Sequence, residues 1–261
     1  MIKFQNPLYD FGYLLYRWVK PVIDPVAAAR SIPSYLRYGR DWFRYGRMEG
    51  AEKRRIIDSA PVMGESTSTT PFDRHYFYQD IWAARKIRES GAADHVDVAS
   101  RIDLVGFLTA ICRVTFVDIR PLMVELPNFR SVKGSILALP FADASVTSLS
   151  CLHVAEHIGL GRYGDPLNPA GTMQACRELA RVLAPEGNLY FSCPVGVPRL
   201  CFNAHRIHSP ARILEYFSGL TLIEFSGIDD QRRFLPNCPV GTLEHADYAC
   251  GLFHFAKPLR G

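Results

Sequence analysis

From residue 95 onward the chain alternates between short apolar runs and amphipathic segments, and this alternation restricts its fold more than any other feature. The apolar runs predict strands over 95–100, 113–119, 132–139, 144–152, 187–195, 220–228 and 248–258. The amphipathic segments predict helices over 72–91, 103–112, 170–185 and 209–219. Parallel neighbouring strands need a crossover connection, and here helices supply it. The predicted fold class is therefore α/β: a doubly wound, mostly parallel, seven-stranded sheet whose last two strands form an antiparallel edge pair.

Residues 1–63 differ in composition. Residues 1–60 hold eleven Lys or Arg and six Asp or Glu, so their excess of five positive charges exceeds the net +4 of the whole chain. Aromatic residues stand among the arginines, and prolines divide the stretch into short helices. We predict an N-terminal helical extension over 1–63, ahead of an α/β domain over 64–261. The extension is either a cap with buried aromatics or a surface that contacts a membrane interface or an anionic glycan.

Composition also limits the partners and the compartment. A net charge of +4 on 261 residues gives no argument for nucleic acid binding. No stretch approaches the roughly 20 apolar residues of a membrane span, and the N-terminus lacks the apolar centre and cleavage site of a signal peptide. The seven cysteines include no C-x-x-C pair, which favours reduced thiols. We expect a cytoplasmic protein, with peripheral membrane contact through residues 1–60 as the alternative. The oligomeric state stays open.

Two acidic residues stand where a parallel sheet binds its ligands, at the carboxyl ends of the strands. Asp97 lies at the end of the first predicted strand, and Asp118 ends the second, 21 residues later. A carboxylate at that spacing can accept hydrogen bonds from two ribose hydroxyls, as in many adenosine sites. A turn or helix-capping aspartate explains Asp118 equally well when it is taken alone.

The order of the segments strengthens the ligand interpretation. HVDVAS, VTFVDIRP, ALPFADASV and RELARVLAPEGNLYFS resemble the class I S-adenosylmethionine-dependent methyltransferases, which have a Rossmann-like fold. HYFYQDIWAARKI, VDIRPL, HIGLGRYGDPLNPAG and FNAHRIHSP resemble more closely the domain of unknown function 268 family, over about residues 70–235. The resemblance implies S-adenosylmethionine as the cofactor. It places the cofactor against Asp97, Ala99, Ser100, Arg101, Asp118, Ile119, Leu137 and His153.

The chain departs from the methyltransferase pattern in the loop after the first strand. That loop usually reads D/E-x-G-x-G-x-G, but Ala99, Arg101 and Asp103 replace the glycines that let the backbone approach the cofactor. Ser135 stands where an acid often contacts the adenine. Either the loop takes another path or the cofactor binds weakly. Arg101 offers a fork of donors for a carboxylate or a phosphate instead.

The segment HVAEH (153–157) has the H-x-x-E-H spacing of one class of zinc proteases. Such a site needs both histidines and the glutamate on one sustained helix, whereas here a strand precedes the motif and GLGRYGDP follows it. We therefore predict no metal. A different site, in which His153 or His157 joins His205 or His208, is the minority alternative.

The same segment supplies the predicted catalytic residues. His153 ends the fourth strand at the carboxyl edge of the sheet and is the first candidate for a general base; His157, Glu156 and Asp165 are reserves. The stretch GLGRYGDPLNPAG is either a lid over an acceptor or a structural loop. Five residues from this stretch and from FNAHRIHSP are the predicted acceptor-binding set: Arg162, Tyr163, His205, Arg206 and His208.

The predicted function is S-adenosylmethionine-dependent methyl transfer to a small polar acceptor. A sugar or glycan precursor is favoured by the association of the family with polysaccharide biosynthesis. One alternative is an inactive methyltransferase-like module that binds a partner, a ligand or a membrane surface. Another is a nucleotide-linked enzyme such as a dehydrogenase, which the missing G-x-G-x-x-G disfavours.

Overall fold

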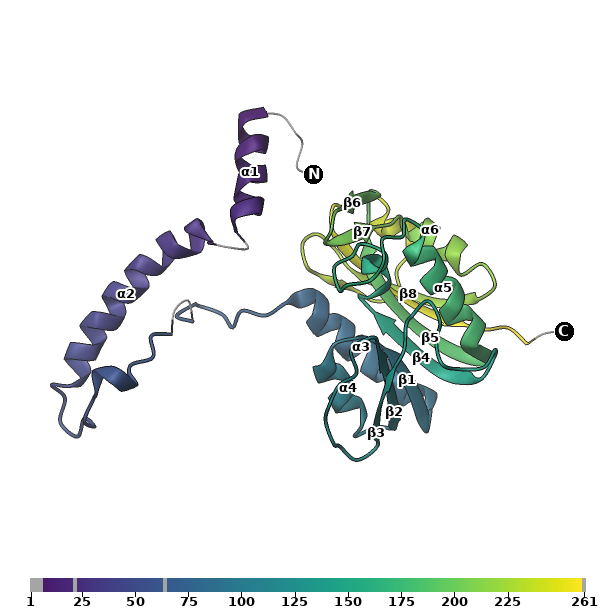
Figure 1. Ribbon diagram of the computed structural model, residues 1–261, viewed down its shortest axis with the longest axis horizontal. Helices are drawn as coiled ribbons and strands as arrows, with labels where there is room; N and C mark the ends of the chain where they lie inside the picture. The colour runs from purple at the N-terminus through teal and green to yellow at the C-terminus, as the bar shows by residue number, and fades with distance from the viewer. Residues whose placement is uncertain (1–6, 21–22, 63–64, 260–261) are drawn as a thin grey trace. The chain divides into compact units, whose positions relative to one another are not determined.

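The computed structural model describes residues 7–20, 23–62 and 65–259, and the chain divides into two compact units, residues 1–72 and 73–261 (Figure 1). The predicted boundary at residues 63 and 64 lies outside the described residues. Among the helices that are described, none has the length and apolar character needed to cross a membrane. The two units are treated separately below.

The first unit contains helices, and none of its described side chains is buried. It contains α1 (Pro7–Val19), α2 (Pro25–Tyr45) and the 3-10 turn η1 (Ile56–Asp58). Asp24 caps α2, because its Oδ1 accepts hydrogen bonds from the backbone N–H groups of Val26 at 3.1 Å and Ala27 at 2.9 Å. None of the described side chains of α2 is buried. Within this unit, the helical conformation of α2 is therefore stabilised by its local cap and by helix propensity rather than by tertiary packing.

The second unit carries all of the strands that the structure describes. Its helices are α3 (Arg74–Ser90), α4 (Ile102–Leu108), α5 (Gly171–Val182) and α6 (Pro210–Tyr216), with 3-10 turns η2 (Ala155–His157) and η3 (Val240–Leu243). Its strands are β1 (Asp94–Val98), β2 (Arg113–Asp118), β3 (Phe129–Lys133), β4 (Val146–Leu152), β5 (Leu183–Val195), β6 (Arg199–Cys201), β7 (His205–Ile207), β8 (Thr221–Ile228), β9 (Phe234–Leu235) and β10 (Ala249–Ala256).

The main sheet has the order β3-β2-β1-β4-β5-β10-β8-β9. The neighbours from β3 to β5 are parallel, and β10 pairs antiparallel with both β5 and β8. The predicted α/β class and the antiparallel edge are thus confirmed. The sheet has an eighth strand because the two-residue β9 pairs with the end of β8. A separate β6–β7 hairpin lies outside it.

The third strand lies earlier in the sequence than predicted. It covers Phe129–Lys133 rather than 132–139, and the residues that follow form a turn closed by a bridge between Ser135 and Ala138. Ile136 and Leu139 in this turn are buried. Their apolar character therefore serves the core and not a strand, which explains why the sequence pattern was misleading at this point.

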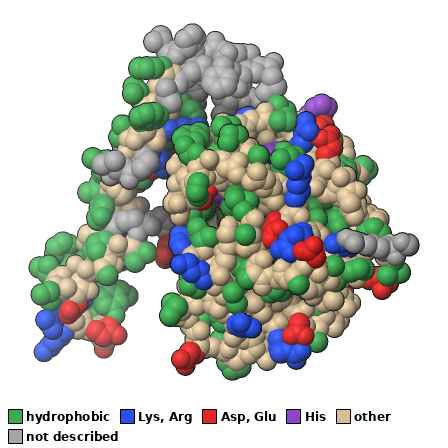
Figure 2. All heavy atoms as spheres, turned by 45° about the vertical axis from the view of Figure 1, so that its right-hand side comes forward, with side chains coloured by type: hydrophobic (Ala, Val, Ile, Leu, Met, Phe, Trp, Pro, Cys, Tyr) green, Lys and Arg blue, Asp and Glu red, His purple; other side chains and the backbone are tan. Residues whose placement is uncertain are grey.

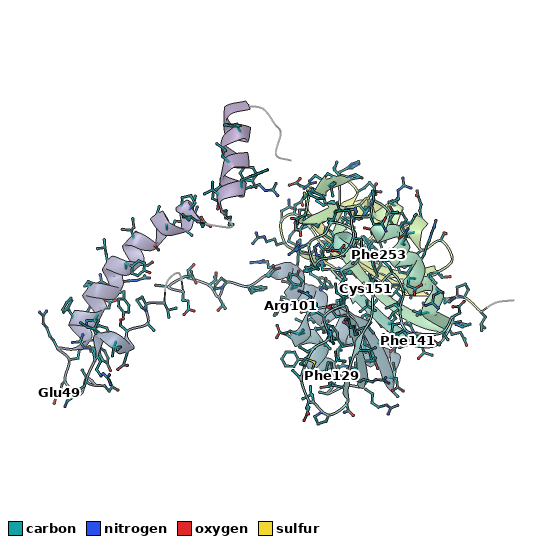
Figure 3. The ribbon with its side chains drawn as sticks, viewed as in Figure 1. Glu49, Arg101, Phe129, Phe141, Cys151 and Phe253 are labelled. Carbon is teal, nitrogen blue, oxygen red and sulfur yellow. The ribbon has the colours of Figure 1, made fainter. Side chains whose placement is uncertain are left out.

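Helices cover both faces of the sheet (Figure 1). On one face, α5 and α6 bury Leu179, Val182 and Phe217 against strand residues such as Phe191 and Phe253. On the other, α3 and α4 bury their own apolar residues, which are Trp82, Ala83, Ile87, Leu104, Val105 and Leu108. Each fully buried side chain of this kind contributes about 1.5–3 kcal/mol through removal from water. Cys151 and Phe253 lie inside this packed region (Figure 3).

Candidate functional site

Two adjoining cavities open at the carboxyl ends of the parallel strands. One, of about 410 Å³, lies beside Asp118 and is called the Asp118 cavity. The other, of about 360 Å³, lies beside Glu156 and is called the Glu156 cavity. Their walls share four residues, which are Ala99, His153, His157 and Tyr163. The two cavities therefore adjoin along the side chains of these shared residues.

The Asp118 cavity has a largely apolar wall that also includes two acidic residues, Asp118 and Asp165. Asp118 ends β2, and its side chain accepts a hydrogen bond from the backbone N–H of Arg120 at 2.7 Å. Ile119, Ile136 and Leu137 supply apolar wall. This combination suits a flat, apolar ring system joined to a group that donates hydrogen bonds.

The loop after β1 achieves its sharp bend without glycine. Ala99 has a left-handed φ of 56°, and its N–H donates to the carbonyl of Val117 at 3.0 Å. A non-glycine residue in this region costs on the order of 1 kcal/mol. The missing glycine at this position therefore does not change the local backbone bend, although a Cβ now faces the shared wall of the two cavities.

Arg101 occupies the second position where the family pattern has glycine. Its guanidinium donates to Asp103 at 2.8 Å and lies 5.0 Å from the ring centre of Tyr76. It lines the Glu156 cavity, and Figure 3 shows its place beyond the end of β1. At this position the structure thus has a cationic side chain, whereas the methyltransferase pattern has a glycine without a side chain.

Asp97 lies beneath the loop rather than in a cavity wall. It is fully buried, accepts a hydrogen bond from the backbone N–H of Ser100 at 3.0 Å, and accepts another from the Ser150 hydroxyl. Burial raises the pKa of Asp97 to about 6. Among the predicted cofactor residues, Asp97 alone lines neither cavity, so its geometry is that of a support that joins β1, β4 and the loop.

His153 stands where the two cavities meet. It directly follows Leu152, the last residue of β4, has a left-handed φ of 56° and is 9% exposed. Its Nδ1 lies 2.5 Å from Oε1 of Gln79, and that oxygen also accepts from the Ser192 hydroxyl at 2.5 Å. Because an amide oxygen only accepts hydrogen bonds, Nδ1 carries the proton and Nε2 keeps its lone pair.

The lone pair of His153 has no partner within the described part of the chain. Nε2 is buried and makes no hydrogen bond there, although His153 lines both cavities. Burial lowers the pKa of His153 to about 3, so the ring is neutral near pH 7. Gln79 and Ser192 thus fix a neutral imidazole whose acceptor nitrogen has no partner among the described residues, in a side chain that lines both cavities.

Glu156 adds a second buried polar group whose hydrogen-bonding capacity is unused within the described part of the chain. It is fully buried in η2, and neither carboxyl oxygen forms a hydrogen bond with the described residues. Nε2 of His157 lies 3.5 Å from Oε1, but Nδ1 of His157 donates to the carbonyl of Ala204 at 2.5 Å. Burial raises the pKa of Glu156 to about 8 and lowers that of His157 to about 4. The charged forms of both groups are disfavoured in the absence of a ligand.

The H-x-x-E-H segment does not lie on a sustained helix. Only one 3-10 turn, Ala155–His157, follows β4, and α5 begins at Gly171. Glu156 and His157 therefore lie in a separate turn ahead of α5. Across residues 7–20, 23–62 and 65–259, no group of three or more His, Cys, Asp or Glu side chains has a geometry that could hold a metal ion.

The glycine-rich segment that follows is a closed loop. Asp165 accepts hydrogen bonds from the N–H groups of Gly159 at 2.6 Å and Tyr163 at 3.3 Å. Arg206 donates to the carbonyls of Ile158 at 2.6 Å and Asn168 at 3.0 Å. The loop carries Tyr163, Asp165 and other residues into the wall of the Asp118 cavity. It is therefore a loop closed by its own hydrogen bonds that also forms part of a cavity wall.

The predicted acceptor-binding residues separate into two groups. Arg162, Tyr163 and His205 line the Glu156 cavity. Arg206 lines neither cavity and holds the glycine-rich loop. His208 is also outside both walls, with its ring 5.7 Å from that of Tyr216.

Sequence reasoning did not select Tyr76, Tyr248 or Gln79. Both tyrosines line the Glu156 cavity, and burial raises the pKa of each. Gln79 is a fully buried amide on a helix face that otherwise buries Trp82 and Ala83. A polar residue at a core position of an amphipathic helix was the one sequence signal available.

Comparisons with known proteins bear on the family and on the fold. The sequence model of the family described as "Caenorhabditis protein of unknown function, DUF268" matches residues 129–238. No significant match is found among curated protein sequences.

Solved structures show the same fold at low sequence identity. N-methyltransferase NodS from Bradyrhizobium japonicum WM9, in complex with S-adenosyl-L-homocysteine, is 14% identical with a TM-score of 0.52; the match covers 84% of this chain and 97% of that one. The [4+2]-cyclase SpnF is 14% identical with a TM-score of 0.51, over 69% of this chain and 82% of that one. The predicted resemblance is thus confirmed: residues 129–238 match the DUF268 family, and the chain has the α/β fold of the class I S-adenosylmethionine-dependent methyltransferases.

Proposed function

We propose that the protein binds S-adenosylmethionine and transfers its methyl group to a hydroxyl of a small polar acceptor, such as a sugar or a glycan precursor. The observation that carries this proposal is the pair of adjoining cavities that share His153 as a lining residue, together with the unpaired Nε2 of that histidine among the described residues. One cavity has the chemistry of a nucleoside site, and the other presents buried acceptors to a ligand that donates hydrogen bonds.

The residues of the Asp118 cavity fit the adenosine end of the cofactor. Asp118 would accept hydrogen bonds from the ribose hydroxyls, and Ile119, Ile136 and Leu137 would contact the adenine faces. The amino-acid end would lie past Ala99, where the guanidinium of Arg101 can receive a carboxylate. The bound cofactor supplies a methyl group that is already activated by its positive sulfur.

The Glu156 cavity favours an acceptor that carries hydroxyl groups. An unpaired buried carboxyl group and an unpaired imidazole nitrogen each cost about 1–3 kcal/mol, which a ligand donor can offset. A hydroxyl donates to such atoms and also accepts from the tyrosines of the wall, whereas an ammonium group only donates. Arg101 and Arg162 make part of the wall cationic, which favours an additional anionic group on the acceptor.

His153 has the position and tautomer of a general base. In a methyl transfer to a hydroxyl, Nε2 of His153 would take up the hydroxyl proton, while the bound cofactor would supply the methyl group and its sulfur would keep the electron pair of the carbon–sulfur bond. Alkylation makes that proton strongly acidic, so a base with a pKa of about 3 is sufficient for its removal. Gln79 and Ser192 keep Nε2 free of a proton beforehand. Positioning of the two reactants supplies the rest of the rate.

Calorimetric titration with S-adenosylmethionine and S-adenosylhomocysteine tests the proposal. We expect micromolar binding, and Asp118→Ala should weaken it about tenfold or more through loss of a ribose partner. Glu125→Ala is the matched control, because Glu125 is an exposed acid on the segment after β2. If the folded wild type binds neither compound, the cofactor assignment fails and the alternative, an inactive methyltransferase-like module, replaces it.

A further inference from the structure

The first unit segregates arginines and apolar side chains along α2. Arg30, Arg37 and Arg44 recur every seven residues, which places them on one face of the helix. Ile32, Leu36 and Phe43 are spaced by four and seven residues and form a different face. Leu36 is 72% exposed and Phe43 is 64% exposed. The helix is therefore basic on one side and apolar on another.

Helix α1 repeats this arrangement on a smaller scale. Phe11, Leu15 and Trp18 follow the i, i+4, i+7 spacing of one helix face, and they are 61%, 50% and 79% exposed. Arg17 and Lys20 carry the positive charge at the end of this segment. Figure 2 shows hydrophobic side chains gathered on the surface of this unit. Both helices thus present large apolar groups that the unit itself does not bury.

Charge and side-chain type indicate what covers these faces. Helix α2 contains four arginines against one acid, Asp41, which pairs with Arg40 at 2.9 Å. Tryptophan and tyrosine, which are frequent in both helices, favour the boundary between water and lipid. The phosphates of a nucleic acid would pair with the arginines, but the apolar faces of the helices would stay in water. An anionic lipid surface satisfies both faces at once, because the apolar side enters the headgroup region and the arginines contact phosphate groups.

We propose that α1 and α2 form an interfacial anchor that binds the surface of an anionic lipid bilayer. The helices lie in the plane of the surface, which agrees with the finding that no described helix could cross a membrane. The proposal does not depend on the reaction of the second unit. It also explains why a unit with so many aromatic residues has no buried position in α2.

Co-sedimentation of the full chain with vesicles tests the anchor. The probes are vesicles of phosphatidylcholine alone and vesicles that also contain phosphatidylglycerol. We expect at least tenfold tighter binding to the anionic vesicles, with a loss on addition of salt. Equal binding to both vesicle types, or no binding to either, would overturn the proposal.

Two pairs of variants identify the surface that binds. Arg37→Glu, Arg40→Glu and Arg44→Glu together should weaken binding at least tenfold, since about 1 kcal/mol per basic residue near the surface corresponds to about fivefold each. The charge-matched control changes three exposed arginines of the second unit to Glu: Arg88, Arg130 and Arg177. If the control set weakens binding equally, the attraction is general to the protein and the anchor is refuted.

The second pair tests the apolar faces. Leu36→Ser with Phe43→Ser should lower binding to anionic vesicles, whereas Phe107→Ser with Met123→Ser should not, although Phe107 and Met123 are 77% and 89% exposed. Thermal melts accompany each variant. A lower melting temperature for the α2 variants, together with unchanged vesicle binding, would show that the segment is a protein cap and would overturn the lipid proposal.

Discussion

The two units contain similar aromatic and charged residues but differ in how far they bury them. The second unit buries aromatic side chains such as Phe253 and, beside them, polar groups such as Glu156 and His153. The first unit leaves Phe43 and Trp18 largely exposed and keeps its charges in solvent. Burial changes the properties of ionisable groups, because it shifts their pKa and removes competing water. Exposed charged and apolar side chains instead remain free to contact another molecule or a membrane. Buried polar groups and exposed apolar groups are thus found in different units of one chain.

Equivalent truncations should affect the units very differently. Phe253→Ala removes a fully buried ring and should lower the free energy of unfolding by about 3–5 kcal/mol. Phe43→Ala, in the exposed face of α2, should change it by no more than about 0.5 kcal/mol. Urea denaturation of both variants measures the difference. A large effect of Phe43→Ala would show that the first unit shares a core with another part of the molecule, which breaks the contrast.

The carboxyl group of Glu156 gives a pH-dependent prediction. Its pKa is raised to about 8 in the folded protein, so between about pH 4.5 and pH 8 the folded state holds a proton that the unfolded state has lost. The wild type should therefore lose stability as the pH rises through this window. Glu156→Gln keeps the shape of the side chain but removes its titration. The free energy of unfolding of this variant, relative to that of the wild type, should therefore increase by on the order of 3 kcal/mol between pH 4.5 and pH 8.

Urea denaturation of the two proteins across this pH range measures that difference. A constant difference between wild type and Glu156→Gln would mean that Glu156 is solvated or paired in solution. Because other groups titrate equally in both proteins, the comparison isolates this carboxyl group.

The glycine-rich loop allows a finer test within the second unit. A Cβ at Gly159 would lie 2.1 Å from the carbonyl oxygen of Asn168, and the residue has a φ of 80°. Gly164 has a similar φ of 83° but open space around it. Gly164→Ala should cost about 1 kcal/mol of backbone strain, and Gly159→Ala should cost more and weaken cofactor binding. Melting temperatures and calorimetry compare them, and equal effects would mean that the loop relaxes freely.

The smallest expected effect lies in the first unit. Asp24→Ala removes the two hydrogen bonds that cap α2 and should weaken that helix by about 1 kcal/mol, seen as lost helicity by circular dichroism. Asp41→Ala removes an exposed acid inside the same helix and serves as the control. If both variants keep full helicity, contacts other than the cap hold the helix.

Much of the second unit could be predicted from the sequence. The period of the apolar residues indicated most strands and helices, and the quoted family phrases indicated the order of the strands. The pattern was misleading at residues 132–139, where Ile136 and Leu139 are buried in a turn. Periodicity reports which residues are buried, but it does not report whether a short apolar run forms a strand.

The candidate site could be predicted only in part. Asp118 and His153 follow strands, and position at a strand end is readable from sequence. Asp97 also ends a strand, yet its side chain points toward Ser150 and not into a cavity. Gln79 acts on His153 from 74 residues away in the chain, a contact that no local pattern reports. Arg206 and Arg162 looked equivalent in sequence, but only the second lines a cavity.

The sequence by itself determined the alternation of elements, the basic and apolar faces of α2, and the replacement of glycines by Ala99 and Arg101, because these are local properties of neighbouring residues. Only the tertiary structure decided that the Asp118 and Glu156 cavities meet at one histidine, which nitrogen of that histidine is free, and that the Glu156 carboxyl group has no partner among the described residues. These depend on contacts between distant segments and on burial, which arise only when the sheet and its helices pack together.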